Sequence, residues 1–222
     1  MYSTIVAFFQ EGGVFMYPIL IVLALGVAIA VERWLFLTMT IAKNKALWNQ
    51  VTPHIKSGNL AGAMQVTQRS KAAIAQIMTY GLNRVRTARR REDVEQAMEE
   101  SLMEVMPRLE KRTHYLATFA NIATLLGLLG TIIGLITAFT AVSNANPAEK
   151  ADLLSASISV AMNTTAFGLI VAIPLLLIHT LLQTKTTEII DSLEMASVKF
   201  LNAITERATE PVAKPAMAKA AG

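Results

Sequence analysis

Neutral oxygen-bearing side chains gather in the long apolar stretches of the second half of the chain. Ser157, Asn163, Thr164 and Thr165 lie close together in one stretch, and Thr131 lies in the stretch before it. Hydroxyl and amide oxygens can bind a dehydrated cation or accept a hydrogen bond from a hydrated proton. These five residues are therefore candidates for an ion pathway, or for a socket that receives another helix. For each Ser and Thr, the alternative is a hydrogen bond back to its own helix.

Small residues accompany these oxygens and predict close contact between helices. Gly130 and Gly134 form a small-xxx-small pair, which lets two backbones approach. On a helical wheel the hydroxyl residues share a face with small residues, and we expect that face to line a narrow polar lumen beside Thr131. Pro174 lacks an amide hydrogen and is expected to kink its helix. The candidate packing or pore-lining residues are Gly127, Gly130, Gly134, Ala161, Gly168 and Pro174.

Several kinds of chemistry are excluded by composition. The chain has no cysteine, so it has no disulfide, thiolate metal site or cysteine nucleophile, and its three histidines make a metal enzyme implausible. No activated nucleophile or carboxylate pair is visible, and we expect neither enzymatic activity nor a cofactor. Glu32 is the acid expected near membrane depth, and its neighbour Arg33 suggests an ion pair at the membrane interface.

Long uncharged stretches predict an all-α membrane protein with three transmembrane helices. Residues 12–31 carry no charge, and residues 113–148 and 153–184 contain no Asp, Glu, Lys or Arg and one histidine each. About 20 helical residues cross a hydrocarbon core of about 30 Å, so the second and third helices are expected to continue into water. The predicted segments are 1–11 (periplasmic), 12–42 (first span), 43–112 (cytoplasmic, helical), 113–142 (second span), 143–152 (periplasmic loop), 153–184 (third span), 185–207 (cytoplasmic helix) and 208–222 (disordered tail).

Lysine and arginine are unevenly distributed between the connections. Residues 33–112 hold fourteen of them, whereas residues 1–17 hold none and residues 143–152 hold only Lys150. Positive residues favour the cytoplasmic side, so the amino terminus is expected outside and the carboxyl terminus inside.

The region 43–112 is polar but has a helical pattern. The segment Lys56 to Leu60 predicts the end of one helix and the start of the next. Gly81 predicts a second interruption. From Arg91 onward, apolar residues recur every three or four positions and predict an amphipathic helix that enters the membrane directly. Three consecutive arginines precede this helix, but acidic residues follow and no aromatic residues are interleaved. The pattern therefore favours a solvated helix near anionic lipid over nucleic-acid binding.

Four motifs together resemble the ExbB/TolQ/MotA family. They are Gly12 to Ile19, Glu32-Arg33, Leu126 to Gly134 and Ala166 to Pro174, and they occur in order across all three spans. Three spans make the chain similar to the ExbB and TolQ branch.

The resemblance implies a homopentamer in the inner membrane of a Gram-negative cell. Such a pentamer encloses the helices of two single-span ExbD/TolR-like partners with an intramembrane aspartate, and drives a TonB- or TolA-like protein with H⁺ or Na⁺. The family's lumen threonines correspond to Thr131 and Thr165. Proton-driven members carry a glutamate where this chain has Val160. Because this chain lacks that titratable group, coupling to Na⁺ is a second hypothesis beside coupling to H⁺. A non-conducting scaffold and an autonomous ion channel are the alternative functions.

Overall fold

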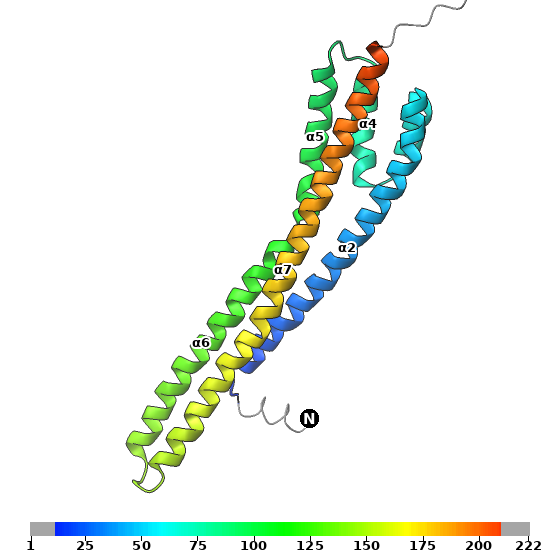
Figure 1. The fold of residues 1–222 in the computed structure, drawn as a ribbon. Coiled ribbons are helices and arrows are strands. Elements are labelled where there is room, and N and C mark those ends of the chain that lie inside the picture. The colour runs from blue at the N-terminus through cyan, green and yellow to red at the C-terminus, as the bar shows by residue number, and fades with distance from the viewer. Residues whose placement is uncertain (1–11, 210–222) are drawn as a thin grey trace, which may run out of the picture. The chain divides into compact units, whose positions relative to one another are not determined.

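The computed structural model describes residues 12–209, and these residues form α-helices and connecting turns without a strand (Figure 1). The all-α class predicted from the sequence is confirmed. In chain order the helices are α2 (Met16–Ser57), α3 (Leu60–Gln68), α4 (Ala73–Val85), α5 (Arg91–Glu110), α6 (Thr113–Asn144) and α7 (Lys150–Thr209). The segment predicted to be periplasmic (1–11) and residues 210–222 of the predicted tail lie outside the described residues. Residues 208 and 209 still belong to α7.

The described residues divide into two compact units. Residues 12–37 and 110–186 form the first, called here the membrane unit, and residues 38–109 and 187–209 form the second, the polar unit. The helices α2 and α7 supply residues to both. The 60 residues of α7 correspond to about 90 Å of helix, far more than a hydrocarbon core of about 30 Å. This confirms the expectation that the third span continues beyond the membrane.

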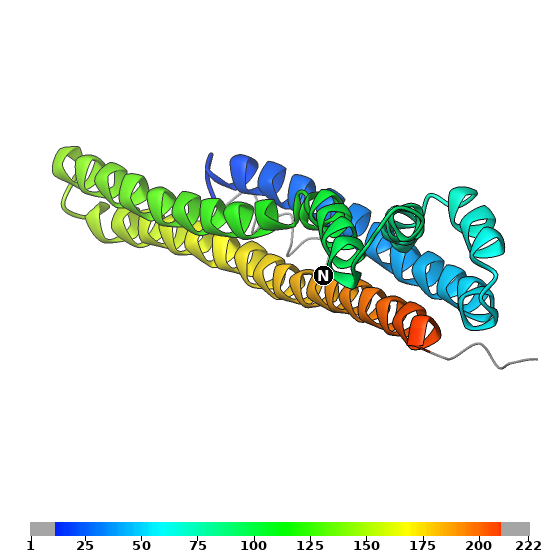
Figure 2. The ribbon, with the colours of Figure 1, turned by 90° about the horizontal axis from the view of Figure 1, so that it is seen from above.

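The membrane unit contains α6 and α7 side by side and antiparallel, joined by a short turn (Figures 1 and 2). Within the described part of the chain, three helical stretches are long and apolar enough to cross a membrane. They are Met16–Ser57, Arg91–Asn144 and Lys150–Glu206, and each overlaps one of the three predicted spans. Pro174 does not end its helix, because α7 runs through it without interruption. At one end of the unit, Lys185 of α7 places its Nζ 3.4 Å from the ring centroid of Trp34 on α2. A tryptophan and a lysine together are typical of a membrane interface.

The break between α2 and α3 was predicted and is confirmed. Gly58 has φ +75°, the left-handed conformation that ends helices, and the Asn59 amide donates to the His54 carbonyl over 2.9 Å. Asn59 then caps the next helix, because its Oδ1 accepts a hydrogen bond from the Gly62 amide at 2.8 Å. The two caps explain why the chain stops and restarts helix formation here.

The predicted interruption at Gly81 is wrong. Helix α4 runs through this residue, which is buried within the polar unit. A Cβ at Gly81 would lie 2.8 Å from Met98 Sδ and 3.0 Å from Phe200 Cε1. Glycine therefore serves close packing against α5 and α7, and that packing outweighs its low helix propensity.

The amphipathic helix predicted from Arg91 is α5, and its apolar row is buried as expected. That row consists of Val94, Met98, Leu102, Val105 and Leu109. The helix does not continue directly into the second span, because α5 ends at Glu110 and α6 begins at Thr113. Arg112 separates them with φ +66°, the one positive φ at a non-glycine residue among residues 12–209. A left-handed residue cannot continue a right-handed helix, so α5 and α6 are separate helices.

Candidate ion pathway

The predicted small residues bring α6 and α7 into direct backbone contact. A Cβ at Gly168 would lie 2.7 Å from the Ala123 carbonyl oxygen, and one at Gly127 would lie 3.2 Å from Thr165 Cα. At Gly134 an added Cβ would lie 2.9 Å from Ala161 Cβ. Within one protomer these residues therefore pack the two helices together. The small face of α7 does not line a lumen between α6 and α7, because the α6 backbone fills that space.

Thr165 joins the two helices by a hydrogen bond. Its Oγ1 donates to the Gly127 carbonyl oxygen, 2.9 Å away on α6. Thr131 instead donates to its own helix, with 2.6 Å between its Oγ1 and the Leu128 carbonyl oxygen. In both cases the single hydroxyl proton is engaged, so the oxygen retains lone pairs that can only accept a hydrogen bond or bind a cation. Both hydroxyls are therefore suited to receive a positively charged species.

Thr164 lies on the other side of α7 and anchors the segment before α2. Its buried Oγ1 lies 2.7 Å from the Gly12 carbonyl oxygen and 2.9 Å from that of Val160. The neighbouring Gly130 on α6 would bring an added Cβ into collision with Thr164 and to 3.4 Å from Phe15 Cβ. The start of α2 thus covers one side of the α6–α7 pair.

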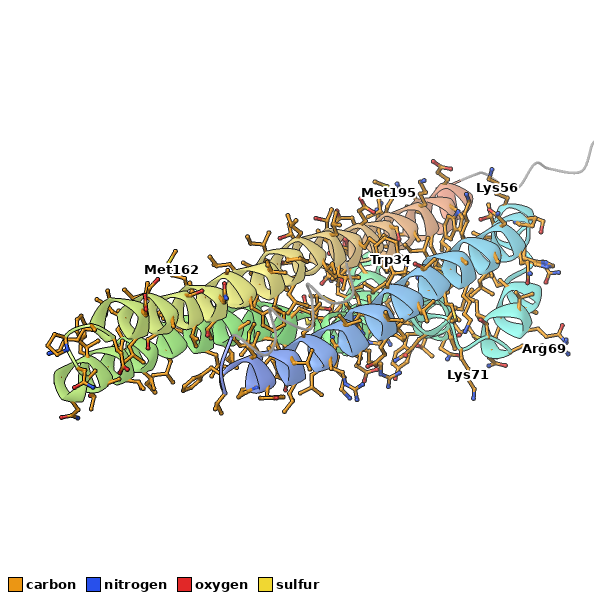
Figure 3. The ribbon with its side chains drawn as sticks, turned by 90° about the horizontal axis from the view of Figure 1, so that it is seen from below. Trp34, Lys56, Arg69, Lys71, Met162 and Met195 are labelled. Atoms are coloured by element: carbon orange, nitrogen blue, oxygen red, sulfur yellow. The ribbon has the colours of Figure 1, made fainter. Side chains whose placement is uncertain are left out.

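Thr131 and Thr165 lie on the opposite side of this pair. Thr131 follows Gly130 by one residue, and Thr165 follows Thr164 by one residue. One residue corresponds to a turn of about 100° around a helix. Because α6 and α7 are antiparallel, the two turns point the same way, away from the start of α2. Met162, one turn from Thr165 on that side, is 66% exposed and projects away from α7 (Figure 3). The protomer therefore leaves the side that carries the two threonines uncovered.

A cavity of about 260 Å³ lies on the covered side, next to the start of α2. Ser157 and Thr164 of α7 contribute hydroxyl groups to it, as does Thr137 of α6, and Val160 forms part of its wall. Sequence reasoning missed Thr137 and the Gly12 carbonyl oxygen. The polarity of Thr137 within an apolar helix could have indicated its role. Only the folded chain places the Gly12 carbonyl oxygen beside Thr164.

Asn163 belongs to neither group of hydroxyls. It is half-buried, and its side-chain amide forms no hydrogen bond to another residue between 12 and 209. Two residues before Thr165, it lies on nearly the opposite side of α7. Of the five predicted pathway residues, Thr131 and Thr165 thus lie on the same side of the α6–α7 pair, Ser157 and Thr164 line the cavity on the other side, and Asn163 belongs to neither pair.

The structure adds a partner to the predicted ion pair between Glu32 and Arg33. The Glu32 carboxylate binds Arg112, whose Nη1 lies 2.7 Å from Oε1 and 2.8 Å from Oε2. The Arg33 side chain is buried, its guanidinium carbon lies 4.8 Å from the ring centroid of Phe36, and it interacts electrostatically with both Glu32 and Arg112. Sequence reasoning missed Arg112 because 80 positions separate it from Glu32.

Comparison with protein families agrees with this architecture. Residues 69–195 match the model of the MotA/TolQ/ExbB proton channel family, and this match covers α4 to α6 and most of α7. The chain belongs to this family. Its members are channels that energise transport, and this member is a proton-channel energy transducer of the three-span branch. It is a multi-pass protein of the inner membrane.

Relatives of this MotA/TolQ/ExbB protein carry the names of that branch. A putative biopolymer transport protein ExbB homolog of Methanothermobacter thermautotrophicus is 28% identical over 196 residues, which cover 87% of this chain and 68% of that protein. The putative biopolymer transport protein ExbB-like 3 of Synechocystis is 28% identical, over 76% of this chain and 80% of its own length. The Tol-Pal system protein TolQ of Haemophilus influenzae is 36% identical over 81 residues, 36% of this chain and 35% of that protein.

Proposed function

We propose that this chain is the ion-conducting subunit of a rotary or stepwise membrane motor. Five copies surround two helices from a single-span ExbD/TolR-like partner, and an aspartate of that partner exchanges the ion with Thr131 and Thr165. The observation that supports this most directly is the pair of hydroxyls on the uncovered side of α6 and α7. Each has its proton engaged and its lone pairs free to accept.

The group that loads and unloads the ion comes from the partner in this proposal. Residues 113–148 and 153–184 contain no carboxylate, and Val160 stands where proton-driven relatives carry a glutamate. Neutral hydroxyls support transfer of a proton through water and also suit a dehydrated sodium ion. The description of the family favours the proton, and sodium is the second candidate ion. One charge that crosses 100 mV releases about 2.3 kcal/mol, enough to bias a step of rotation.

The work is delivered outside the inner membrane. The excess of lysine and arginine in residues 33–112 supports a cytoplasmic location for that region, with the turn between α6 and α7 in the periplasm and the carboxyl terminus inside. A TonB- or TolA-like protein receives the motion there, and the output is outer-membrane transport or envelope maintenance. The names of the relatives support both kinds of output.

Replacing each threonine by valine tests the ion-conducting role. Valine keeps the shape and removes the hydroxyl, whereas serine at the same position keeps the hydroxyl and serves as the matched control. Loss of one oxygen that binds the ion costs about 1–3 kcal/mol, so Thr131→Val and Thr165→Val should each lower ion flux on the order of tenfold or more. Flux is measured in liposomes that contain this chain copurified with a single-span, aspartate-bearing partner, while pH and Na⁺ gradients are varied independently.

The outcomes separate the alternatives. Flux without any partner would indicate an autonomous channel, and normal flux in both valine variants would contradict the roles of the two hydroxyls. Absence of flux in every preparation, together with stable partner binding, would favour a scaffold. Flux that does not change with sodium at fixed pH would end the sodium hypothesis.

A further inference from the structure

A second polar row on α6 continues from Thr131 toward the Thr113 end of the helix. Asn121 and Thr124 belong to it, and both side chains are exposed although they lie within the apolar helix. With Leu128 and Thr131, these residues occupy an arc of about 80° on a helix that turns about 100° per residue. The row therefore lies on the same uncovered side as Thr131 and Thr165.

The Asn121 amide needs a polar environment that the protomer does not supply. Its side chain forms no hydrogen bond to any residue in the range 12–209. An amide has two donor hydrogens and an acceptor oxygen, and leaving them unpaired in hydrocarbon is strongly unfavourable. An exposed asparagine eight residues into a membrane helix must therefore face water or another protein surface.

Thr124 has the same arrangement as Thr131. Its Oγ1 donates to the Ala120 carbonyl oxygen at 3.1 Å, so its lone pairs are left to accept. Ten residues separate Asn121 from Thr131, which corresponds to about 15 Å along the helix, or half of the hydrocarbon core. The row thus leads from mid-membrane to the inner surface in the orientation proposed above.

We infer that Asn121 and Thr124 line the inner half of the ion pathway and carry the ion between Thr131 and the cytoplasmic side. This inference rests on the proposed function. Asn121 supplies both donor and acceptor groups to a chain of water molecules, and Thr124 supplies an acceptor. The conducted species is the same cation that meets Thr131 and Thr165.

Labelling of single cysteines tests this inference without background, because the chain has no cysteine of its own. Cysteine is placed at Asn121, Thr124 and Thr131 in the full-length protein in native membranes, and each variant is treated with a small, positively charged methanethiosulfonate. Only a thiolate in contact with water reacts. The matched controls are cysteines at Ile122 and Leu129, which are exposed on the other side of α6.

We expect the three positions on the row to react on the order of tenfold faster than the controls, because apolar surroundings raise the pKa of a thiol. Fast labelling at Thr131 with slow labelling at Asn121 and Thr124 would overturn this inference and leave the proposed function intact. Slow labelling at all three positions would contradict both. Asn121→Leu should also reduce ion flux and Asn121→Ser should restore it, whereas Thr140→Val, on the opposite side of α6, should leave flux unchanged.

Discussion

The contact between Gly168 and α6 yields the prediction with the clearest magnitude. In Gly168→Ala, the new Cβ would lie 2.7 Å from the Ala123 carbonyl oxygen and 3.1 Å from Gly127 Cα. Both atoms belong to the backbone and cannot rotate away. Ordinary contact begins at about 3.4 Å, so α6 and α7 must separate by roughly 0.7 Å at this point. The same movement takes the hydrogen bond between Thr165 and Gly127 from 2.9 Å to about 3.6 Å, beyond hydrogen-bonding distance.

The two effects add to a substantial loss of stability. Overpacking of this kind costs about 1–3 kcal/mol, a lost hydrogen bond costs about 1 kcal/mol more, and alanine regains about 0.5–1 kcal/mol over glycine in a helix. For a chain of this length the expected fall in apparent Tm is about 3–12 °C. It is measured by heating the purified complex in detergent and following the fraction that remains assembled.

Gly26→Ala is the matched control on a neighbouring helix. Its Cβ would lie 2.7 Å from Leu175 Cδ2, but that atom is the tip of a side chain that can change rotamer. Alanine also gains about 0.5–1 kcal/mol in helix stability over glycine, so the net change should stay within about 1 kcal/mol. An equal Tm for the two alanine variants would refute the reasoning from backbone contact.

Two further predictions concern the helix junctions. The backbone amides of Arg89 and Arg90 donate to Asp93 Oδ2 and hold the pKa of that carboxyl below its ordinary value. Its stabilisation is therefore present above the unfolded pKa of about 4 and is lost as pH falls through the lower folded value. The Tm difference between wild type and Asp93→Asn should be largest near neutral pH, shrink as pH falls below the unfolded pKa of about 4 and vanish below the folded pKa; a difference that does not vary with pH would exclude this role. Arg112→Gly should leave Tm unchanged or raise it, because relief of the left-handed conformation, worth about 1–2 kcal/mol, offsets loss of the exposed pair with Glu32, worth about 0–1 kcal/mol. A marked fall in the Tm of Arg112→Gly would show that the ion pair dominates.

The proposed pathway separates two kinds of polar residue within the same helices. Thr164 is buried and holds the segment before α2 through the Gly12 carbonyl oxygen, so it serves the fold. Thr131, Thr124 and Asn121 lie on a side that the protomer leaves uncovered. Polar side chains in a membrane helix are unfavourable unless they contact water or protein. The uncovered residues Thr131, Thr124 and Asn121 are therefore the ones that we assign to the pathway.

The sequence alone determined the features that depend on neighbouring residues. Long uncharged stretches fixed the three spans, and the apolar repeat from Arg91 fixed the buried row of α5. The glycine and asparagine at positions 58 and 59 fixed the end of one helix and the start of the next. Each of these features follows from hydropathy, helical periodicity or backbone conformation within one or two turns, and tertiary contacts change them little.

Only the tertiary structure decided which side chains meet. The sequence predicted a helix interruption at Gly81, but this residue packs against Met98 and Phe200 inside a continuous helix. Glu32 pairs with Arg112, a residue 80 positions away that no local pattern could indicate. A helical wheel gives the angle of each residue but not the neighbour that occupies that angle. For this reason the sequence predicted a single face with Ser157, Thr164 and Thr165 beside Thr131, and the packing of α6, α7 and the start of α2 divides these residues.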